Sequence, residues 1–334
     1  MAWKNEAWLA LGEEEALEPE LAICDPHHHL WDFPQSRYLL AELVADTQGH
    51  RIEKTVFVEC GSMYRAEGPA ALRPVGETEF VQGVAAQSAS GGYGDMRACA
   101  GIVGHADLLL GAAVDEVLEA HCAASPNRFR GIRHAAAWHA SEQIRESHSR
   151  PPPHMFGEAR FREGFARLAA RGLSFDAWLF HTQIDELCEL AHAFEETSII
   201  LDHVGGPLGI GPFEDRHAEV LPGWKRSISS LAACPNVVLK LGGLQMPICG
   251  FGWHKRDKPP SSAELADRLA PYYLHCIDAF GPERCMFESN FPVDKSSCSY
   301  TVLWNSFKLI TRGFSHSERE AMFQGTAVRV YRLD

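Results

Sequence analysis

The sequence predicts a (β/α)8 barrel, and three observations support that fold. Short apolar runs rich in β-branched residues alternate with segments of helical spacing along almost the whole chain. Eight such runs can be counted, and eight strands that alternate with helices are expected to pair in parallel and close into a barrel. The alternative, an open doubly wound sheet, usually has fewer strands and a glycine-rich first turn, whereas the first run here leads into His-Leu-Trp-Asp.

Each of the eight runs is expected to form one strand of the barrel wall. They span Leu21–His29, Lys54–Cys60, Met96–Val103, Phe129–His134, Leu173–His181, Ser198–His203, Asn236–Leu241 and Arg284–Asn290. Residues 1–20 are acidic and are assigned to an N-terminal arm, and residues 21–334 to a single barrel domain.

Amphipathic segments between these runs are long enough to be crossover helices. They cover Glu77–Ala89, Leu109–Ala124, Phe161–Arg171, Ile184–Glu195, Trp224–Ala233 and Ala263–Phe280. Two C-terminal helices are predicted over Tyr300–Thr311 and Glu318–Tyr331, the second opened by the capping-box pattern Ser-His-Ser-Glu. The connections Trp138–Glu158 and Gln245–Ser262, after strands four and seven, are longer than a barrel needs. Loops that follow strands lie at the catalytic end, so both are expected to cover or wall a site.

Composition narrows the function classes. The formal net charge is −13, from 31 Lys and Arg against 44 Asp and Glu, and no basic run occurs, which argues against nucleic-acid and anionic-membrane partners. No apolar run reaches membrane-span length and the N-terminus lacks signal-peptide features, so a cytoplasmic location is expected. The ten cysteines include no Cys-x-x-Cys pair, and we expect reduced thiols. The sequence leaves homo-oligomerisation open.

The segment Asp-Pro-His-His-His-Leu-Trp-Asp at the end of the first strand is the centre of the functional argument. Side chains two residues apart share one face of a strand, so His27 and His29 can point at a common centre. Imidazole is among the commonest ligands of zinc and related metals. The pair therefore predicts one half of a metal or catalytic site.

Polar residues also end the other predicted strands, and strand ends in a barrel point into one shared mouth. After His27 and His29 they are Glu59 and Cys60, Arg133 and His134, His181, Asp202 and His203, Lys240, and finally Glu288 and Asn290. One such histidine would be an ordinary buried residue. Four of them, at positions 27, 29, 181 and 203, favour a metal or catalytic role.

These motifs resemble the amidohydrolase-related barrel hydrolases, in particular the branch of sugar lactonases and pyrone-dicarboxylate lactonases. The similar segments are the first-strand motif, Phe-Arg-Gly-Ile-Arg-His at 129–134, Leu-Asp-His-Val-Gly-Gly-Pro at 201–207, residues 236–244, and Met-Phe-Glu-Ser-Asn-Phe-Pro-Val-Asp at 286–294. The resemblance extends from residue 21 to about 334. It implies a site at the barrel mouth with His27, His29, His181 and His203 at the family's histidine positions.

One residue departs from that pattern. The family usually ends strand eight with an aspartate that binds metal or acts as a base, and this chain has Asn290, whose amide cannot accept a proton from water near neutral pH. Glu288 or Asp294 is one replacement, and a histidine, His181 or His203, is another. Loss of chemistry, leaving a barrel that only binds ligand, is a further alternative.

The expected activity is hydrolysis of a lactone or similar cyclic ester of a carboxylated small molecule. In one version a divalent metal, Zn or Mn, is bound by His27 and His29 with His181 or a water completing the set, and it polarises the carbonyl or activates water. In a version without metal, the same histidines donate hydrogen bonds to the developing oxyanion. The alternative activity is a metal-dependent non-oxidative decarboxylation, which would release carbon dioxide instead of a ring-opened acid.

Substrate binding is assigned to residues at strand ends and on the long loops. The planar fork of Arg133 suits a substrate carboxylate, although a structural ion pair with an acidic neighbour is an equal alternative. The other expected contacts are His134, Lys240, Trp138 and Trp253, the tryptophans being suited to a ring-shaped substrate.

Overall fold

The barrel predicted from the sequence is confirmed. A computed structural model describes residues 5–34 and 36–333, and its eight-stranded parallel sheet follows chain order. The strands are β1 (Ala22–His28), β4 (Arg51–Val58), β5 (Arg97–Gly104), β6 (Phe129–Arg133), β7 (Ser174–Ala177), β8 (Ile199–Leu201), β9 (Val237–Leu241) and β10 (Cys285–Phe287). Beyond β10, the Asn290 amide donates to the His27 carbonyl at 2.9 Å and the His29 amide to that of Phe291 at 2.7 Å, which joins the last strand to the first.

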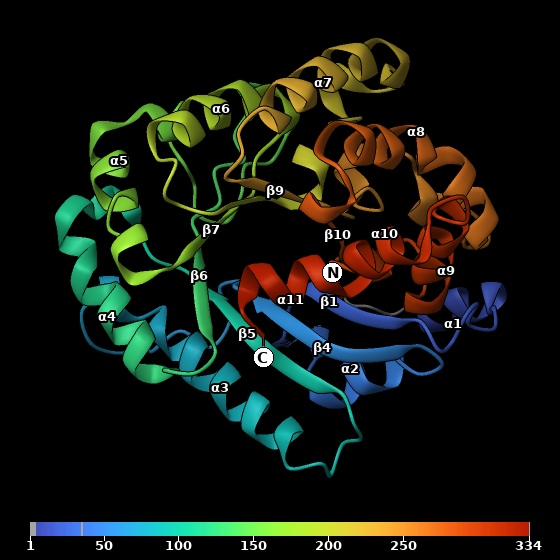
Figure 1. The fold of residues 1–334 in the computed structure, drawn as a ribbon, viewed down its shortest axis with the longest axis horizontal. Helices are drawn as coiled ribbons and strands as arrows, with labels where there is room; N and C mark the ends of the chain where they lie inside the picture. The colour runs from blue at the N-terminus through green and yellow to red at the C-terminus, as the bar shows by residue number, and fades with distance from the viewer. Residues whose placement is uncertain (1–4, 35, 334) are drawn as a thin grey trace.

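Helices surround the sheet, as Figure 1 shows. They are α1 (Glu6–Leu9), α2 (Leu40–Asp46), α3 (Val75–Ala89), α4 (Val114–Ala124), α5 (Ala159–Phe165), α6 (Ile184–Ala193), α7 (His217–Ala232), α8 (Ser262–Phe280), α9 (Tyr300–Ile310), α10 (His316–Glu320) and α11 (Thr326–Tyr331). The hairpin of β2 (Trp31–Phe33) and β3 (Ser36–Tyr38) and helix α2 follow β1 and were not predicted.

The C-terminal helix predicted over Glu318–Tyr331 is not continuous. The capping box is present, with the Ser315 hydroxyl and the Glu318 carboxylate each bonded to the other's backbone amide. However, α10 ends at Glu320, a π-helical turn spans Ala321–Gly325, and α11 follows. This turn brings α11 across one end of the barrel, where it lies in front of the strands in Figure 1.

The inside of the barrel has an apolar layer below a charged one. The apolar layer contains Cys24, Val56, Val58, Val103, Ile200, Val238 and Met286, and Ala327, Tyr331 and Leu333 from the C-terminal segment pack on it. Because side chains alternate along a strand, the next inward residue after Val238 is Lys240, and the one after Met286 is Glu288. The polar residues of the strands therefore sit between this apolar layer and the catalytic end.

The described part of the N-terminal arm lies against the barrel. Trp8 donates its indole N–H to the Arg256 carbonyl at 2.9 Å, and Asn305 of α9 donates to the Glu15 carbonyl at 2.9 Å. The arm thus contacts the long loop after β9 and helix α9. Residues 1–4 of the predicted arm lie outside the described residues.

The structure bears on two expectations that were based on composition, the state of the cysteines and the presence of a membrane-spanning helix. All ten cysteines carry free thiols. Within residues 5–34 and 36–333, no helix combines the length and the apolar character needed to cross a bilayer.

Candidate active site at the carboxyl ends of the strands

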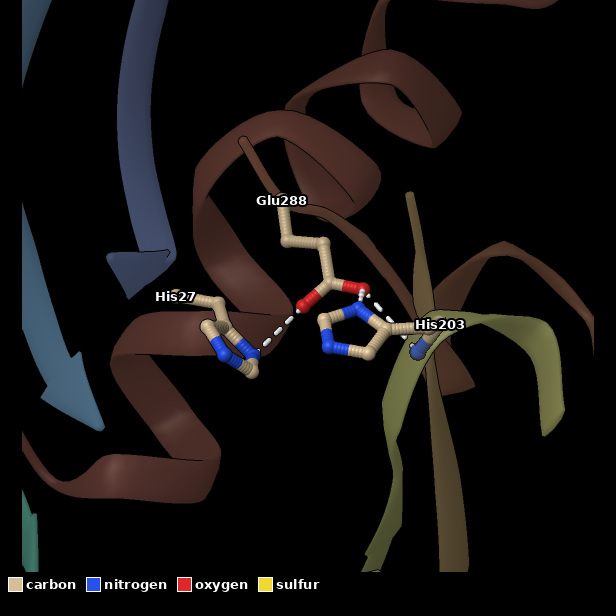
Figure 2. Close-up of side chains that lie close together, drawn as sticks. All are labelled: His27, His203 and Glu288. Carbon is tan, nitrogen blue, oxygen red and sulfur yellow. Dashed lines mark hydrogen bonds and ion pairs between the residues drawn. The ribbon is translucent and has the colours of Figure 1, made fainter. Parts of the chain in front are cut away.

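Glu288 connects two histidines that come from different strands of the barrel. It follows β10, and its carboxylate lies between His27 of β1 and His203 after β8, as Figure 2 shows. The Oε1 atom accepts from the His203 backbone amide at 3.0 Å and lies 2.6 Å from the ring Nδ1. Burial raises the pKa of Glu288, but the adjoining histidines outweigh it and hold the pKa at about 2. The group is therefore an ionised carboxylate that two imidazoles share.

The second oxygen of this carboxylate is less well satisfied. Oε2 of Glu288 lies 2.8 Å from Nδ1 of His27, but it has no well-aligned hydrogen-bond donor among the described residues. Lys240 Nζ lies 3.2 Å from the same Nδ1. A carboxylate accepts hydrogen bonds, so Glu288 favours a proton on Nδ1 of His27. An ammonium only donates them, so Lys240 favours a lone pair on the same nitrogen.

His29 has a defined tautomer. Its Nδ1 donates to the Val58 carbonyl at 2.8 Å, and because a carbonyl only accepts, the proton is on Nδ1 and the lone pair is on Nε2. Burial, together with His27 and Arg133, keeps the pKa of His29 well below its ordinary value, so the ring is neutral. Nε2 of His29 lies 3.3 Å from Nε2 of His27.

These residues fit a divalent metal ion. His27, His203 and Glu288 each offer a ligand atom, and the three atoms lie within 4.8 Å of one another. The 3.3 Å between the Nε2 atoms of His27 and His29 also matches two ligands on one tetrahedral zinc, because bonds of about 2.0–2.1 Å place such ligands about 3.3 Å apart. A carboxylate behind ligating histidines is the usual supporting arrangement.

Two glycines after β9 make room for this group. A Cβ on Gly242 would lie 2.3 Å from Cγ of Glu288, and one on Gly243 would lie 2.5 Å from Cβ of His203. Gly243 also has φ of 71°, in the left-handed region that favours glycine. Glycine at positions 242 and 243 therefore lets the side chains of Glu288 and His203 lie closer to the backbone after β9 than any residue with a Cβ would permit.

Beneath the histidines lies a layer of buried charges. Lys240 is fully buried, and its Nζ lies 2.6 Å from Asp176 Oδ2 and 3.0 Å from Asp202 Oδ1. Burial lowers the pKa of Lys240, but the surrounding carboxylates raise it above its ordinary value. The lysine predicted to bind substrate is thus inside the barrel, neutralised by two aspartates.

Arg133 is also engaged within the protein. Its Nε donates to Glu59 Oε1 at 2.7 Å, another guanidinium nitrogen donates to the Glu59 carbonyl, and Nη1 lies 3.4 Å from Asp202 Oδ2. Nη1 is also 3.4 Å from Nε2 of His27. Of the two interpretations offered for this side chain, the geometry matches the structural ion pair.

The loop after β6 contributes His148 to the mouth. Its Nε2 lies 2.9 Å from Oε2 of the buried Glu59, and its side chain is 42% exposed. Arg133 and His148 together hold the pKa of Glu59 below its ordinary value against the opposing effect of burial. His148 is therefore a partly exposed imidazole whose Nε2 lies against the buried Glu59 carboxylate, which also pairs with Arg133.

His181 does not join the other histidines. Strand β7 ends at Ala177, and His181 instead begins a 3-10 turn, because the chain leaves the sheet four residues before the position that the sequence assigned to the strand end. Its Nδ1 accepts from the Leu208 amide at 3.2 Å, its ring packs on Phe213, and it lines a surface groove of about 580 Å³ beside α7.

Asn290 and Asp294 pair with each other next to the site. The side-chain amide Nδ2 of Asn290 donates to Asp294 Oδ1 at 3.1 Å, and both residues are buried. Burial and the nearby Glu288 raise the pKa of Asp294 well above its ordinary value, which favours the protonated form of this carboxyl. Of the two carboxylates considered as replacements for the missing aspartate, Glu288 is the one that contacts the histidines.

Changing Asn290 to aspartate should therefore not increase activity. An added carboxylate would be buried beside Asp294 and Glu288, and we expect the free energy of unfolding to fall by about 1–3 kcal/mol. Urea denaturation and kcat/KM measurements on Asn290→Asp test this. A higher kcat/KM with unchanged stability would show that position 290 remains the working carboxylate position.

The remaining residues assigned to substrate binding lie in several places. His134 Nδ1 accepts from the Leu108 amide at 3.2 Å and is buried. Trp253 is buried against Phe251, with Arg256 over its ring. Trp138 is half-buried in the loop after β6, with His154 near its ring. None of the three contacts His27, His203 or Glu288 among the interactions of the described residues.

The sequence argument missed Asp176 and Tyr331. Tyr331 Oη donates to Asp176 Oδ2 at 2.6 Å across 155 residues of chain, so no local pattern connects them. Asp176 had a usable signal, since it is the one charged residue in the predicted strand Leu173–His181 apart from the terminal histidine. A charge in a strand buried on both faces needs a partner.

A parallel barrel with histidines and carboxylates at the carboxyl ends of its strands has the arrangement of a barrel enzyme. The family model for amidohydrolases matches residues 24–333. The chain therefore belongs to the amidohydrolase family, and it is a hydrolase.

Individual relatives agree with this assignment. The uncharacterised protein y4mH of Sinorhizobium fredii is 34% identical over 94% of this chain and 99% of its own length. An L-fucono-1,5-lactonase of Burkholderia multivorans is 31% identical over 53% of this chain and 57% of its own. A crystal structure of a Burkholderia multivorans amidohydrolase with bound zinc has a TM-score of 0.71 at 23% identity, covering 94% of this chain and all of that one, which supports the fold.

Proposed function

We propose that this hydrolase opens a lactone, and that the substrate is derived from a sugar acid. The observation that carries the proposal is the Glu288 carboxylate held between His27 and His203, with Nε2 of His29 adjoining. The name of the Burkholderia multivorans relative supports the lactone class. The sequence-based preference for a carboxylated substrate rested on Arg133, whose donors are engaged by Glu59 and Asp202, so a neutral polyhydroxylated lactone is preferred here.

A divalent metal ion is part of the proposal. His27, His203 and Glu288, whose ligand atoms lie within 4.8 Å of one another, would hold it, and Nε2 of His29 adjoins His27 at 3.3 Å. When bound, such an ion polarises the lactone carbonyl and lowers the pKa of a water molecule.

The chain's own residues would supply the proton transfer. The raised pKa of Asp294 favours its protonated form, and Glu288 is a weak base because of its low pKa, so neither suits acceptance of a proton from water. His148 is exposed at the mouth, and Glu59 orients it through Nε2. In the proposal, Nδ1 of His148 accepts the proton from water and returns it to the alkoxide that leaves as the ring opens.

A lactone panel with metal analysis tests the proposal. Purified protein should release acid from sugar-derived γ- and δ-lactones, as followed with a pH indicator, and lose at least 90% of this activity, about tenfold, on chelation. Restoration by Zn or Mn alone is expected. Activity retained by protein shown to be metal-free would favour the oxyanion mechanism without metal. Release of carbon dioxide from an aromatic acid, with no lactone opened, would contradict the proposal and favour a decarboxylase.

A further inference from the structure

One tryptophan lies at the level of the site histidines. Asp176 points into the barrel, where its Oδ2 accepts from Lys240 at 2.6 Å. Side chains two residues apart share a face of an extended chain, so Trp178 is directed the same way, one layer nearer the carboxyl ends of the strands. The backbone is still paired at this point, because the Ala136 amide donates to the Trp178 carbonyl at 2.8 Å. The ring centres of Trp178 and His203 are 4.9 Å apart.

Trp178 is the accessible member of this group. The proposed metal ligands His27, His203 and Glu288 are buried, whereas Trp178 is only half-buried. Its ring meets those of His203 and Phe180 at interplanar angles of 74° and 80°, so both contacts are edge against face. Among the described residues, no aromatic ring stacks in parallel on the indole. A molecule bound at His203 can therefore contact part of an aromatic surface that the protein leaves uncovered.

The turn after β8 makes room for this indole. A Cβ on Gly206 would lie 2.9 Å from Cζ3 and 3.0 Å from Cη2 of Trp178, closer than real Cβ contacts. Gly206 also has φ of 49°, in the region that favours glycine. It directly follows the 3-10 turn Asp202–Gly205, which carries His203. The same short segment thus presents the histidine and accommodates the indole, which fixes the two rings relative to each other.

The indole N–H of Trp178 is not used inside the protein. No acceptor for it exists among the described residues. Trp31 differs in this respect, although its ring stacks on that of His29 with 6.0 Å between the ring centres. Its N–H donates to the Ser36 hydroxyl at 2.9 Å, and the residue is buried. Trp178 therefore offers an aromatic surface and a free hydrogen-bond donor on one side chain.

We propose that Trp178 is the platform on which the substrate ring lies, and that it selects lactones with the hydroxylated ring of a sugar acid. The face of an indole carries partial negative charge. The C–H bonds of a sugar ring carry partial positive charge because each carbon bears oxygen, so one face of the ring can lie on the indole. The N–H then donates to a ring hydroxyl. The inference rests on the proposed function for the identity of the substrate, but binding of the ring can be measured without turnover.

The kinetic experiment compares Trp178→Leu and Trp178→Phe with Trp8→Leu. Leucine is apolar but has no aromatic face, and phenylalanine restores the face without the N–H. Trp8 is the control because it is also half-buried, and its N–H donates to the Arg256 carbonyl at 2.9 Å, in contact with the N-terminal arm.

The substrate is L-fucono-1,5-lactone, after the name of the Burkholderia multivorans relative. KM should rise about tenfold in Trp178→Leu, about threefold in Trp178→Phe and less than about twofold in Trp8→Leu, with kcat changing less than about threefold in each. For δ-valerolactone, which has no hydroxyls, the rise in Trp178→Leu should be about threefold or less. A fall in kcat at unchanged KM would show that the indole acts on His203 and not on the substrate, and would overturn the inference.

Equilibrium binding separates this inference from the proposed function. The probe is L-fucono-1,5-lactam, which has the same ring closed by an amide that resists hydrolysis, and calorimetry measures its affinity. Its Kd should be about tenfold higher in Trp178→Leu and unchanged in Trp8→Leu. If Trp178→Leu does not fold, Trp178→Phe decides, with an expected rise of about threefold.

Equal lactam affinities in wild type and the Trp178 variants would overturn the inference. Wild-type protein that binds the lactam through Trp178 but opens no lactone would contradict the proposed function alone. Wild-type protein that neither binds the lactam nor opens the lactone would contradict both.

Discussion

Replacing Glu288 with glutamine is expected to lower kcat/KM by about two to three orders of magnitude. The amide keeps an oxygen for the His203 amide and ring, but its –NH2 group cannot accept from Nδ1 of His27. The negative charge that two imidazoles share also disappears. A carboxylate supporting metal-binding histidines typically contributes about 10–100-fold to metal affinity, and a misoriented ring adds to the loss. Initial rates and zinc calorimetry on Glu288→Gln measure both effects.

Glu77→Gln is the matched control for this substitution. Glu77 is equally buried, in α3, where Oε1 accepts from the Cys60 and Ser62 amides at 3.1 and 2.8 Å. Burial, with a contribution from Glu59, raises the pKa of Glu77 to about 8, so it is uncharged at neutral pH and a glutamine should replace it with little change in activity. Retained activity in Glu288→Gln, combined with loss in Asp294→Asn, would move the functional carboxylate to Asp294.

Replacing Arg133 with methionine is expected to cost about 3–5 kcal/mol of unfolding free energy. The guanidinium pairs with Glu59 and Asp202, and both carboxylates are fully buried. Burial lowers the pKa of Arg133, but these two partners raise it above its ordinary value. Removing one partner of a buried ion pair leaves an uncompensated charge, which is the costly case. Urea denaturation of Arg133→Met provides the measurement.

A second substitution separates the structural from the substrate-binding role. If Glu59 is left unpaired in Arg133→Met, then Arg133→Met with Glu59→Gln should recover part of the lost stability, because one unpaired charge is removed. A substrate-binding arginine would behave differently. Unchanged stability, with KM raised for an acid substrate but not for its methyl ester, would contradict the structural assignment.

The strands could be predicted well from the sequence because their signal is local. All eight predicted runs overlap an observed strand, and, as expected, His27 lies near the end of β1 and Glu288 directly follows β10. His181 shows where this reasoning stops. The apolar stretch Trp-Leu-Phe continues past the end of β7, so composition alone extends the strand, while the backbone leaves the sheet at Ala177.

The charged layer shows a second reason why sequence reasoning was incomplete. Lys240 and Arg133 were placed at the mouth because they end apolar runs, and a run does not show how deep in the barrel each residue lies. Their partners Asp176 and Asp202 come from other strands, and only the closed barrel brings the four together. From the sequence alone, a lysine or arginine at a strand end can therefore be read in two ways. It can bind a ligand at the mouth, or it can pair with buried carboxylates inside the barrel.

The position of Tyr331 also affects when the site can form during synthesis. Tyr331, whose hydroxyl donates to Asp176, ends helix α11, whereas His27 lies in the first strand. Contacts that span 155 and 213 residues belong to the high contact-order part of the fold, and a chain is made from its N-terminus. A nascent chain that has formed β1 to β9 can already pair Lys240 with Asp176 and Asp202, but it lacks the Tyr331 hydroxyl that donates to Asp176. The buried charged layer is therefore completed only once α11 has packed across the end of the barrel.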